Sequence, residues 1–550
     1  MLKGHPTGLA VLFLSNMGER FGYYTMLSIF ALFLEARFGL SEQAVGSVYG
    51  NFLFAVYFLP LFGGWVADRI GYARVVLAGL ILMLLGYVLM AVPFDTLTLV
   101  YGSLLVVALG TGLFKGNLVV LLGNLYDKEP FKALHGAAFN IFYMGINVGA
   151  FFSPYAATGI RDWTLARAGF AYDARIPGLA HQLLAGNAAD SSKLTSLVDP
   201  AVLARFTDLK AFAAAYVDAL ARGYNAGFAI AAGSVVVSLC IFLALKKHYA
   251  HADIAGSRSR LTSAADDLTP EQTRARLGAL VLVFFVVIFF WTAFHQSGLT
   301  LTWFAKNYTV GAVDRLTKVL FDLPALLSCI AAIIGAVYLV KPASTPKVRG
   351  LGAALVAAGL AVAAWRFTGF GETNAISPEL FQSFNPIFVV FLTPVVIALW
   401  ARVAARGKEP SAPRKIMYGM ALAGGAYLVM VAAAQGLASP AALKPGGGVS
   451  DVLLSPYWLI STYLALTVAE LLLSPMGLAF VARVAPPRYR GLMQGGWLAA
   501  TAVGNKLAGA VSIPYERLEL WQTFGLLVVT SLVSAALIAV ILKRLEAATS

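Results

Sequence analysis

The sequence predicts an all-α polytopic membrane protein, and three observations carry this prediction. First, 59% of the 550 residues are hydrophobic and only 12% are charged, whereas about 25% are charged in an ordinary soluble domain. Second, apolar runs of about 20 residues, the length of a membrane-spanning helix, recur along the whole chain. Third, runs such as 277–290 do not alternate apolar and polar residues as the strands of a membrane barrel do. A soluble enzyme, a disordered chain and a β-barrel are therefore excluded.

Each expected element is one long apolar run, and we count about fourteen of them. The first run contains Glu19 and Arg20 and lacks the small-residue cleavage site of a secretory signal. We therefore interpret it as a retained first helix. The expected spans are 8–34, 43–67, 75–93, 97–125, 135–159, 224–245, 277–305, 319–340, 350–367, 380–401, 416–435, 456–482, 492–513 and 521–542.

The basic residues are distributed unequally between the loops. A formal net charge of +14 would by itself also fit a nucleic-acid-binding protein. If both termini are cytoplasmic, however, the short inside loops hold most of the Lys and Arg residues, as the positive-inside rule requires. We assign the charge to membrane topology and expect no nucleic-acid partner. The basic residues left inside predicted spans are Arg20, Lys115 and Lys506.

The polar segments divide the chain into two bundles. Residues 1–247 form the first, residues 248–276 are a cytoplasmic linker, and residues 277–550 form the second. An outside insertion at 160–223 carries a helix signal, because Asp199 can cap and Pro200 suits a first turn. We expect this helix to lie on the bundle or the membrane surface. Its apolar face holds Val202, Phe206, Leu209, Ala213, Tyr216 and Leu220.

Four charged side chains lie well inside predicted spans: Glu19, Arg20, Lys115 and Glu470. Each costs about 3 kcal/mol near the bilayer centre, so each is a functional hypothesis by default. Their charges sum to zero, and a cavity with two cations and two carboxylates matches a small zwitterion. The alternative is that they pair only with one another as static contacts between helices.

Other polar groups surround these charges or lie at similar depth. Tyr23 and Tyr24 are close to the Glu19–Arg20 pair, and Ser474 shares a helical face with Glu470, just before Pro475. A proline in a span usually marks a kink beside a cavity. His295 lies in the span 277–305, where it is either a satisfied core histidine or a proton site.

Neither a metal site nor an enzyme active site is predicted. Cys240 and Cys329 both fall inside apolar spans, which leaves no ligand set for a disulfide framework or a metal cluster. His295 is the only histidine well inside a span, and no HExxH or GxSxG pattern accompanies it. We expect no cofactor. A receptor is a further alternative, but it would not require two half-sites of opposite sign.

Several motifs resemble those of known transporters. The loop 64–74 resembles the signature of the major facilitator superfamily, whose two six-helix bundles rock around a midplane site; the matching conformational residues are Gly64, Asp68, Arg69 and Gly71. The run ERFGYY at 19–24 resembles the first-helix motif of the proton-dependent oligopeptide transporters. The resemblance extends over the chain, except for the outside insertion. Further segments that fit this family are 112–115, 142–150, 290–296, 381–386, 407–411 and 470–475.

The resemblance implies a proton-coupled symporter that imports di- and tripeptides across a bacterial inner membrane as a monomer in the bilayer. Arg20 and Lys115 would receive the peptide carboxylate, and Asn147, Asn385 and Glu470 its amino terminus. Protons would be carried by Glu19 and Glu470, together with His295 if it titrates. The other implied substrate residues are Tyr23, Tyr24 and Tyr49 for the peptide backbone, Trp291 and Trp497 for its side chains, and Ser474 beside Glu470. Alternatives are a transporter of another small zwitterion or anion, and a peptide exchanger without proton coupling.

The chain also departs from the family pattern. Asn16 replaces one usual proton carrier, and the pair that the family forms at its outer gate is replaced by Leu27 and His295. An extra transmembrane hairpin is expected at about 319–367, after the seventh core helix, whereas bacterial relatives carry it after the sixth. We therefore expect coupling through fewer or different groups.

Overall fold

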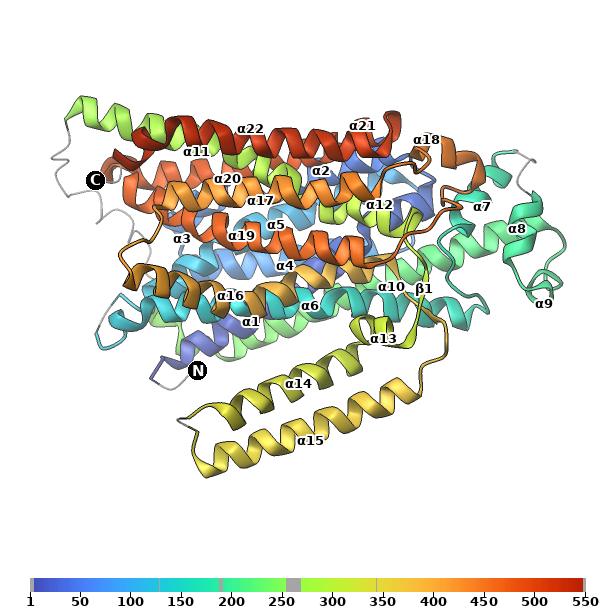
Figure 1. Cartoon of the computed structure of the whole chain (residues 1–550), viewed down its shortest axis with the longest axis horizontal. Coiled ribbons are helices and arrows are strands. Elements are labelled where there is room, and N and C mark those ends of the chain that lie inside the picture. Colours follow the sequence, from blue (N-terminus) through green and yellow to red (C-terminus); the bar gives the residue numbers. More distant parts are fainter. Residues whose placement is uncertain (1–3, 128, 187–190, 254–268, 343, 548–550) are drawn as a thin grey trace.

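The fold is that of a helical membrane protein. The computed structural model describes residues 4–127, 129–186, 191–253, 269–342 and 344–547, and long helices run side by side through it (Figure 1). Eleven helices among these residues are long and apolar enough to cross a membrane. The prediction of an all-α polytopic membrane protein is thereby confirmed. The long helices α1, α6 and α20 fall outside that group of eleven, so the count of fourteen spans stays a prediction.

Each predicted span overlaps a long helix, but the span 43–67 is divided between α2 and α3 and the span 277–305 between α11 and α12. The helices of the N-terminal half are α1 (Thr7–Phe38), α2 (Glu42–Phe58) with α3 (Pro60–Ile70), α4 (Tyr72–Ala91), α5 (Leu97–Asn124), α6 (His135–Arg167) and α10 (Leu209–Ala244). Those of the C-terminal half are α11 (Pro270–Phe294) with α12 (Thr300–Asn307), α14 (Leu323–Val340), α15 (Pro346–Thr368), α16 (Phe384–Ala405), α17 (Ala412–Ala433), α19 (Tyr457–Val484), α20 (Arg490–Ala510) and α22 (Leu520–Ala547).

Short elements connect these helices. They are α7 (Ile176–Leu184), α8 (Ser191–Leu197), α9 (Pro200–Leu203), α13 (Arg315–Lys318), α18 (Pro440–Leu443), α21 (Ser512–Arg517), β1 (Ala312–Val313) and β2 (Asn374–Ala375). The 3-10 turns are η1 (Lys132–Leu134), η3 (Lys246–His248), η4 (Ala250–Ala252), η6 (His295–Gly298), η7 (Val319–Phe321), η8 (Pro378–Ser383), η9 (Lys444–Gly446) and η10 (Pro487–Tyr489).

The two ends of the bundle differ. Both ends of the chain lie at one end, and α7, α8 and α9 project from the other (Figure 1). We call the end with α7 to α9 the outer end and the opposite one the inner end.

The helix predicted across Asp199 to Leu220 is wrong as a single element. Asp199 does cap a helix, since its side chain accepts a hydrogen bond from the Ala201 amide, but α9 ends at Leu203. Asp208 then adopts an extended backbone and accepts from the Ala211 amide, which starts α10 at Leu209. Because α10 continues without a break into the membrane, the span predicted to begin at 224 begins 15 residues earlier. The apolar face from Leu209 therefore belongs to an extended span, not to a separate surface helix.

The helices α14 and α15 form a hairpin at the side of the bundle (Figure 1). They approach each other at glycines: a Cβ on Gly335 would lie 2.6 Å from the Gly352 carbonyl oxygen, and one on Gly359 2.5 Å from that of Ser328. The antiparallel strands β1 and β2 pair just before and just after the hairpin. The chain therefore leaves and re-enters the bundle at one point, between α12 and α16.

Candidate functional site

The predicted carboxylate half of the site begins on α1, where Glu19 and Arg20 form a buried ion pair. Arg20 Nε donates to Glu19 Oε2 at 2.5 Å, and Nη2 donates to Oε1 at 2.7 Å. The side chain of Glu19 is 0% exposed and that of Arg20 is 4% exposed. Two parallel charge-assisted hydrogen bonds offset much of the cost of burying both charges. In this conformation, Glu19 is therefore held by its own neighbour.

Lys115, on α5, is placed differently. Its Nζ lies 3.6 Å from the ring centroid of Tyr57 on α2, and no carboxylate of the described chain forms an ion pair with it. Tyr57 also contacts His295, and the centroids of the two rings are 6.0 Å apart. A cation over an aromatic face is stabilised but keeps its charge available. Tyr57 thus connects the lysine of the N-terminal half to the histidine of the C-terminal half.

The predicted tyrosines are mostly buried. Tyr23 is 2% exposed, and its hydroxyl has no hydrogen-bond partner among the described residues. The Arg20 guanidinium lies 4.8 Å from the Tyr23 ring, and the Tyr24 ring packs edge-on at 5.3 Å. Tyr49 is 1% exposed and approaches Gly298 so closely that a Cβ there would lie 1.9 Å from its hydroxyl. A buried hydroxyl without a partner is free to bind a ligand.

The predicted amine half is partly assembled. Asn385 Nδ2, on α16, donates to Glu470 Oε2 on α19 at 2.9 Å and to Thr467 Oγ1 at 3.0 Å. Asn147, on α6, instead donates to the carbonyl of Tyr143 on its own helix at 3.2 Å. The structure therefore joins Asn385 to Glu470 but gives Asn147 no bond to either.

The remaining predicted substrate residues lie in the C-terminal half. Ser474 follows Glu470 by one turn of α19, next to Pro475 inside the helix. Trp497 is 3% exposed and fills the space at Gly477, where a Cβ would lie 1.9 Å from its ring. Trp291 is 9% exposed, and its Nε1 has no partner among the described residues. Trp497 is a packing contact in this conformation, whereas Trp291 has a free donor.

The span predicted as continuous over 277–305 is broken in the structure. The helix α11 ends at Phe294, and η6 separates it from α12. His295 Nδ1 lies 3.2 Å from the Trp291 carbonyl oxygen, and Tyr463 donates to the carbonyl of Ser297 at 3.2 Å. Interrupted backbone at membrane depth needs such partners, because lipid offers none. The pair Ser297-Gly298 is the sequence feature that indicates this break, but the high hydropathy of the whole run favoured one continuous helix.

The residues of the superfamily signature lie at the end of α3 and at Gly71, which separates α3 from α4. Gly64 is in α3, and Gly71 has φ 98°, a conformation that glycine adopts without strain. Asp68 accepts a hydrogen bond from the Tyr72 hydroxyl, and the Arg69 guanidinium lies 3.6 Å from the Trp65 ring. Sequence reasoning missed Asp253, which accepts from the Ala73 amide at 3.0 Å and so attaches the start of the linker to this loop.

Three ion pairs among the described residues join the halves at the outer end, and sequence reasoning missed them; Lys444–Glu42, at 3.7 Å, is the longest. The other two are closer. Arg161, on α6, pairs with Glu379 in η8, and both side chains are 0% exposed. Arg161 also donates to Asp162 at 2.8 Å and to Ser377 Oγ at 3.0 Å. The second pair, Lys306–Glu35, joins α12 to α1 at 2.5 Å. We call the pairs Arg161–Glu379 and Lys306–Glu35 the outer closure.

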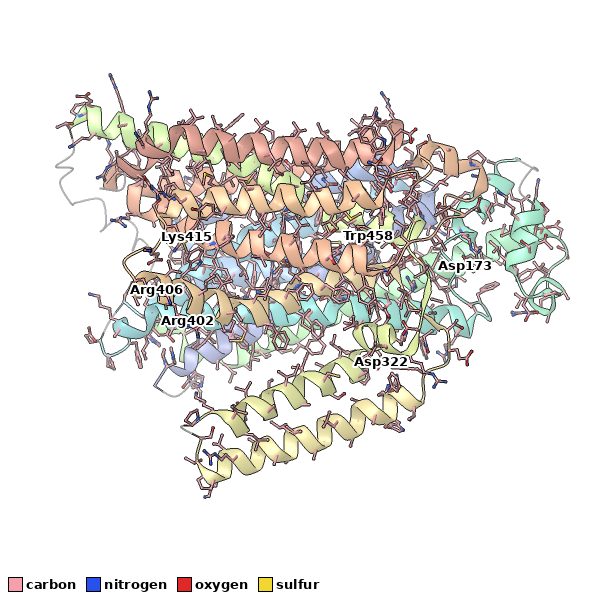
Figure 2. The ribbon with its side chains drawn as sticks, viewed as in Figure 1. Asp173, Asp322, Arg402, Arg406, Lys415 and Trp458 are labelled. Carbon is pink, nitrogen blue, oxygen red and sulfur yellow. The ribbon has the colours of Figure 1, made fainter. Side chains whose placement is uncertain are left out.

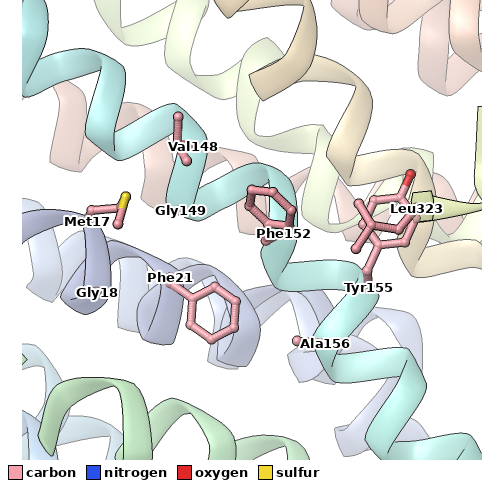
Figure 3. Close-up of a pocket in the computed structure, with 9 residues that line it drawn as sticks. All are labelled: Met17, Gly18, Phe21, Val148, Gly149, Phe152, Tyr155, Ala156 and Leu323. Carbon is pink, nitrogen blue, oxygen red and sulfur yellow. The ribbon is translucent and has the colours of Figure 1, made fainter. Parts of the chain in front are cut away.

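Two cavities are present near these residues. An apolar cavity of about 510 Å³ lies between α1 and α6 and reaches Leu323 of the hairpin (Figure 3). The other, of about 1100 Å³, lies at the outer end between α7, α8 and loops of the C-terminal half. Neither cavity is lined by a predicted substrate residue.

Comparison with known proteins identifies the family of this chain. The model of the POT family matches residues 73–269 and 368–520, which is more than half of the chain. The chain belongs to the POT family. It is therefore a transporter and not an enzyme. The match leaves out 270–367, the segment that holds the broken helix and the hairpin.

Named relatives cover almost the whole chain. A peptide transporter, YePEPT, from Yersinia enterocolitica is 28% identical over 546 residues, which are 94% of this chain and 90% of that protein. Dipeptide and tripeptide permease A of Escherichia coli is 27% identical over 548 residues, 98% of this chain and 91% of that protein. The crystal structure of peptide transporter POT in complex with sulfate has a TM-score of 0.67 at 20% identity, covering 100% of this chain and 96% of that one. The last likeness supports the predicted major facilitator fold.

Proposed function

We propose that this protein imports di- and tripeptides by alternating access and couples their uptake to inward proton movement. The observation that carries the proposal is the placement of opposite charges in the two halves. Arg20 and Lys115 belong to the N-terminal half, and Glu470 with Asn385 belongs to the C-terminal half. A peptide zwitterion can bridge these groups only when the halves approach. Relatives named peptide transporter and dipeptide and tripeptide permease support the same substrate class.

On the carboxylate side, Lys115 is free to receive the peptide, while Arg20 is occupied by Glu19. A peptide carboxylate that takes over Arg20 deprives Glu19 of its cation. Loss of a neighbouring positive charge favours protonation of a carboxylate. Substrate binding and proton binding would then be linked through one arginine, with Glu19 as the proton carrier.

On the amine side, Asn385 occupies one oxygen of Glu470. The peptide ammonium group would bind the Glu470 carboxylate, with Ser474 one turn away on α19. Asn147 would turn from its own helix carbonyl toward the substrate. Tyr23, with its unpartnered hydroxyl, would bind the peptide backbone. Glu470 would also take up a proton when the peptide leaves.

We further propose that the protein lies in a bacterial inner membrane with both termini in the cytoplasm and acts as a monomer. The labelled basic residues Arg402, Arg406 and Lys415 lie toward the inner end, and Asp173 and Asp322 toward the outer end (Figure 2). This bias agrees with the positive-inside rule.

Uptake of a radiolabelled dipeptide into proteoliposomes, with and without an inward proton gradient, tests the proposal. We expect uptake to require the gradient and to be abolished by Lys115→Ala and by Glu470→Ala. Lys408→Ala, which removes an exposed lysine from an inner loop, is the control and should behave as wild type. Uptake without gradient dependence would favour an exchanger, and wild-type rates in both variants would refute the assigned half-sites.

A further inference from the structure

The cavity of about 1100 Å³ at the outer end, which we call the outer vestibule, is built by three separate parts of the chain. The insertion contributes Phe170, Asp173 and Lys193, the C-terminal half contributes residues such as Lys306, Phe381 and Asp451, and α6 contributes Asp162. Small-molecule sites commonly enclose about 300–1,000 Å³. The vestibule is therefore large enough for a di- or tripeptide.

The vestibule adjoins the outer closure. Lys306 lines the cavity and pairs with Glu35. Ser377 lines it as well and accepts a hydrogen bond from Arg161. A solute that enters from outside must pass the closure when it opens, so the vestibule lies on the route to the predicted central site.

Most charged groups that line the vestibule are already paired. Asp162 bonds to Arg161, Asp173 bonds to Arg175 at 2.6 Å, and Lys306 bonds to Glu35. These pairs hold the walls together and leave little charge for a solute.

Lys193 and Asp451 are different. The side chains of both line the cavity and have no hydrogen bond or ion pair with any described residue. They come from different parts of the chain: Lys193 lies on α8 of the insertion and Asp451 on the loop before α19. The insertion comes close to the C-terminal half at Lys193, because a Cβ added at Gly446 would lie 3.1 Å from the Lys193 Nζ.

We propose that the outer vestibule is a first binding site for the peptide zwitterion, in which Lys193 receives the carboxylate and Asp451 the ammonium group. This inference rests on the proposed function. Phe170 and Phe381 line the same cavity and offer apolar surface to the peptide side chains. Because both charges are exposed to water, the site binds weakly and releases the peptide readily when the closure opens.

The test isolates the vestibule from the central site. Ser196, which lines the vestibule, is changed to cysteine in a cysteine-free protein and labelled with an environment-sensitive fluorophore. The central site is disabled by Lys115→Ala and Glu470→Ala. Titration with dialanine should give a saturable signal, and dialanine blocked at both termini should give none.

Single variants then assign the two charges. Lys193→Ala and Asp451→Ala should each weaken dialanine binding by about two- to fivefold, the range for exposed ion pairs. Lys210→Ala and Glu372→Ala, which remove exposed charges elsewhere at the outer end, should not change it. No saturable signal, or equal binding in all four variants, would overturn the proposal. Wild-type uptake is measured in parallel, and its absence would refute the proposed function instead.

Discussion

The outer closure makes a quantitative prediction about Glu379. In Glu379→Gln, the guanidinium of Arg161 stays buried at 0% exposure but loses its full negative partner. Breaking a buried pair in this way costs about 3–5 kcal/mol. Asp162 still bonds to Arg161 and is half exposed, so we take the lower end, about 3 kcal/mol. Opening of the outer end relieves this cost because it returns Arg161 to water.

The expected consequence is a shift in conformational equilibrium. Each 1.4 kcal/mol is a factor of about ten, so about 3 kcal/mol favours the outer-open state about 100-fold. Ser383 lies in η8 together with Glu379, is 2% exposed, and serves as a reporter when changed to cysteine. The native cysteines, Cys240 and Cys329, are first replaced. An impermeant maleimide added from outside should then label the Glu379→Gln protein about 100-fold faster than the protein with Glu379.

A double variant separates this effect from general damage. Arg161→Met with Glu379→Leu replaces the pair by apolar side chains, which is often neutral or stabilising for a buried pair. This protein should label as slowly as the protein with the native pair. Equal labelling rates with Glu379 and with Glu379→Gln, or a double variant as fast as the single one, would refute the reasoning.

Three further predictions follow from single groups. His295→Gln keeps a hydrogen-bonding side chain but cannot titrate, so if His295 carries protons the variant should flatten the pH profile of gradient-driven uptake; an unchanged rate and profile would make His295 structural. Although burial opposes it, the hydrogen bond from Lys444 holds the pKa of Glu516 below its ordinary value. This lowered pKa stabilises the fold at pH values above the ordinary carboxyl pKa, and the stabilisation is lost as the pH falls through the folded-state pKa. Glu516→Gln should therefore lower the melting temperature at pH 7 and lower it progressively less as the pH is made acidic. Cysteines at Ser344 and Ser192 should be labelled only from the inside and only from outside, respectively, and labelling of Ser344 from outside alone would invert the predicted topology.

Much of the fold could be predicted because membrane insertion is a property of local sequence. A long apolar run favours a spanning helix wherever it occurs, since lipid leaves the backbone no other way to satisfy its hydrogen bonds. Each predicted span accordingly overlaps a long helix, although 43–67 and 277–305 are each divided between two helices. Helix starts are local too: Asp199 caps α9 as expected, and Asp208 caps α10 in the same way, within the stretch over which a single apolar face was expected.

Part of the site could be predicted from the sequence for the same reason. Glu19, Arg20, Lys115 and Glu470 stand out because charge is costly inside a span. The partners of these charges could not be predicted, because hydropathy does not specify which way a side chain points within the bundle. The sequence alone could not tell that Glu19 is held by Arg20 while Lys115 lies over Tyr57.

The sequence by itself determined the helices, the charged side chains that are costly to bury in a membrane, and the motifs of the POT family. The tertiary structure alone decided which distant groups meet. Arg161 and Glu379 are 218 residues apart, and Lys306 and Glu35 are 271 apart, yet these pairs close the outer end. The outer vestibule likewise exists only because the insertion folds over loops of the other half. Hydropathy and capping act between near neighbours in the chain, whereas such pairs depend on the packing of two bundles against each other.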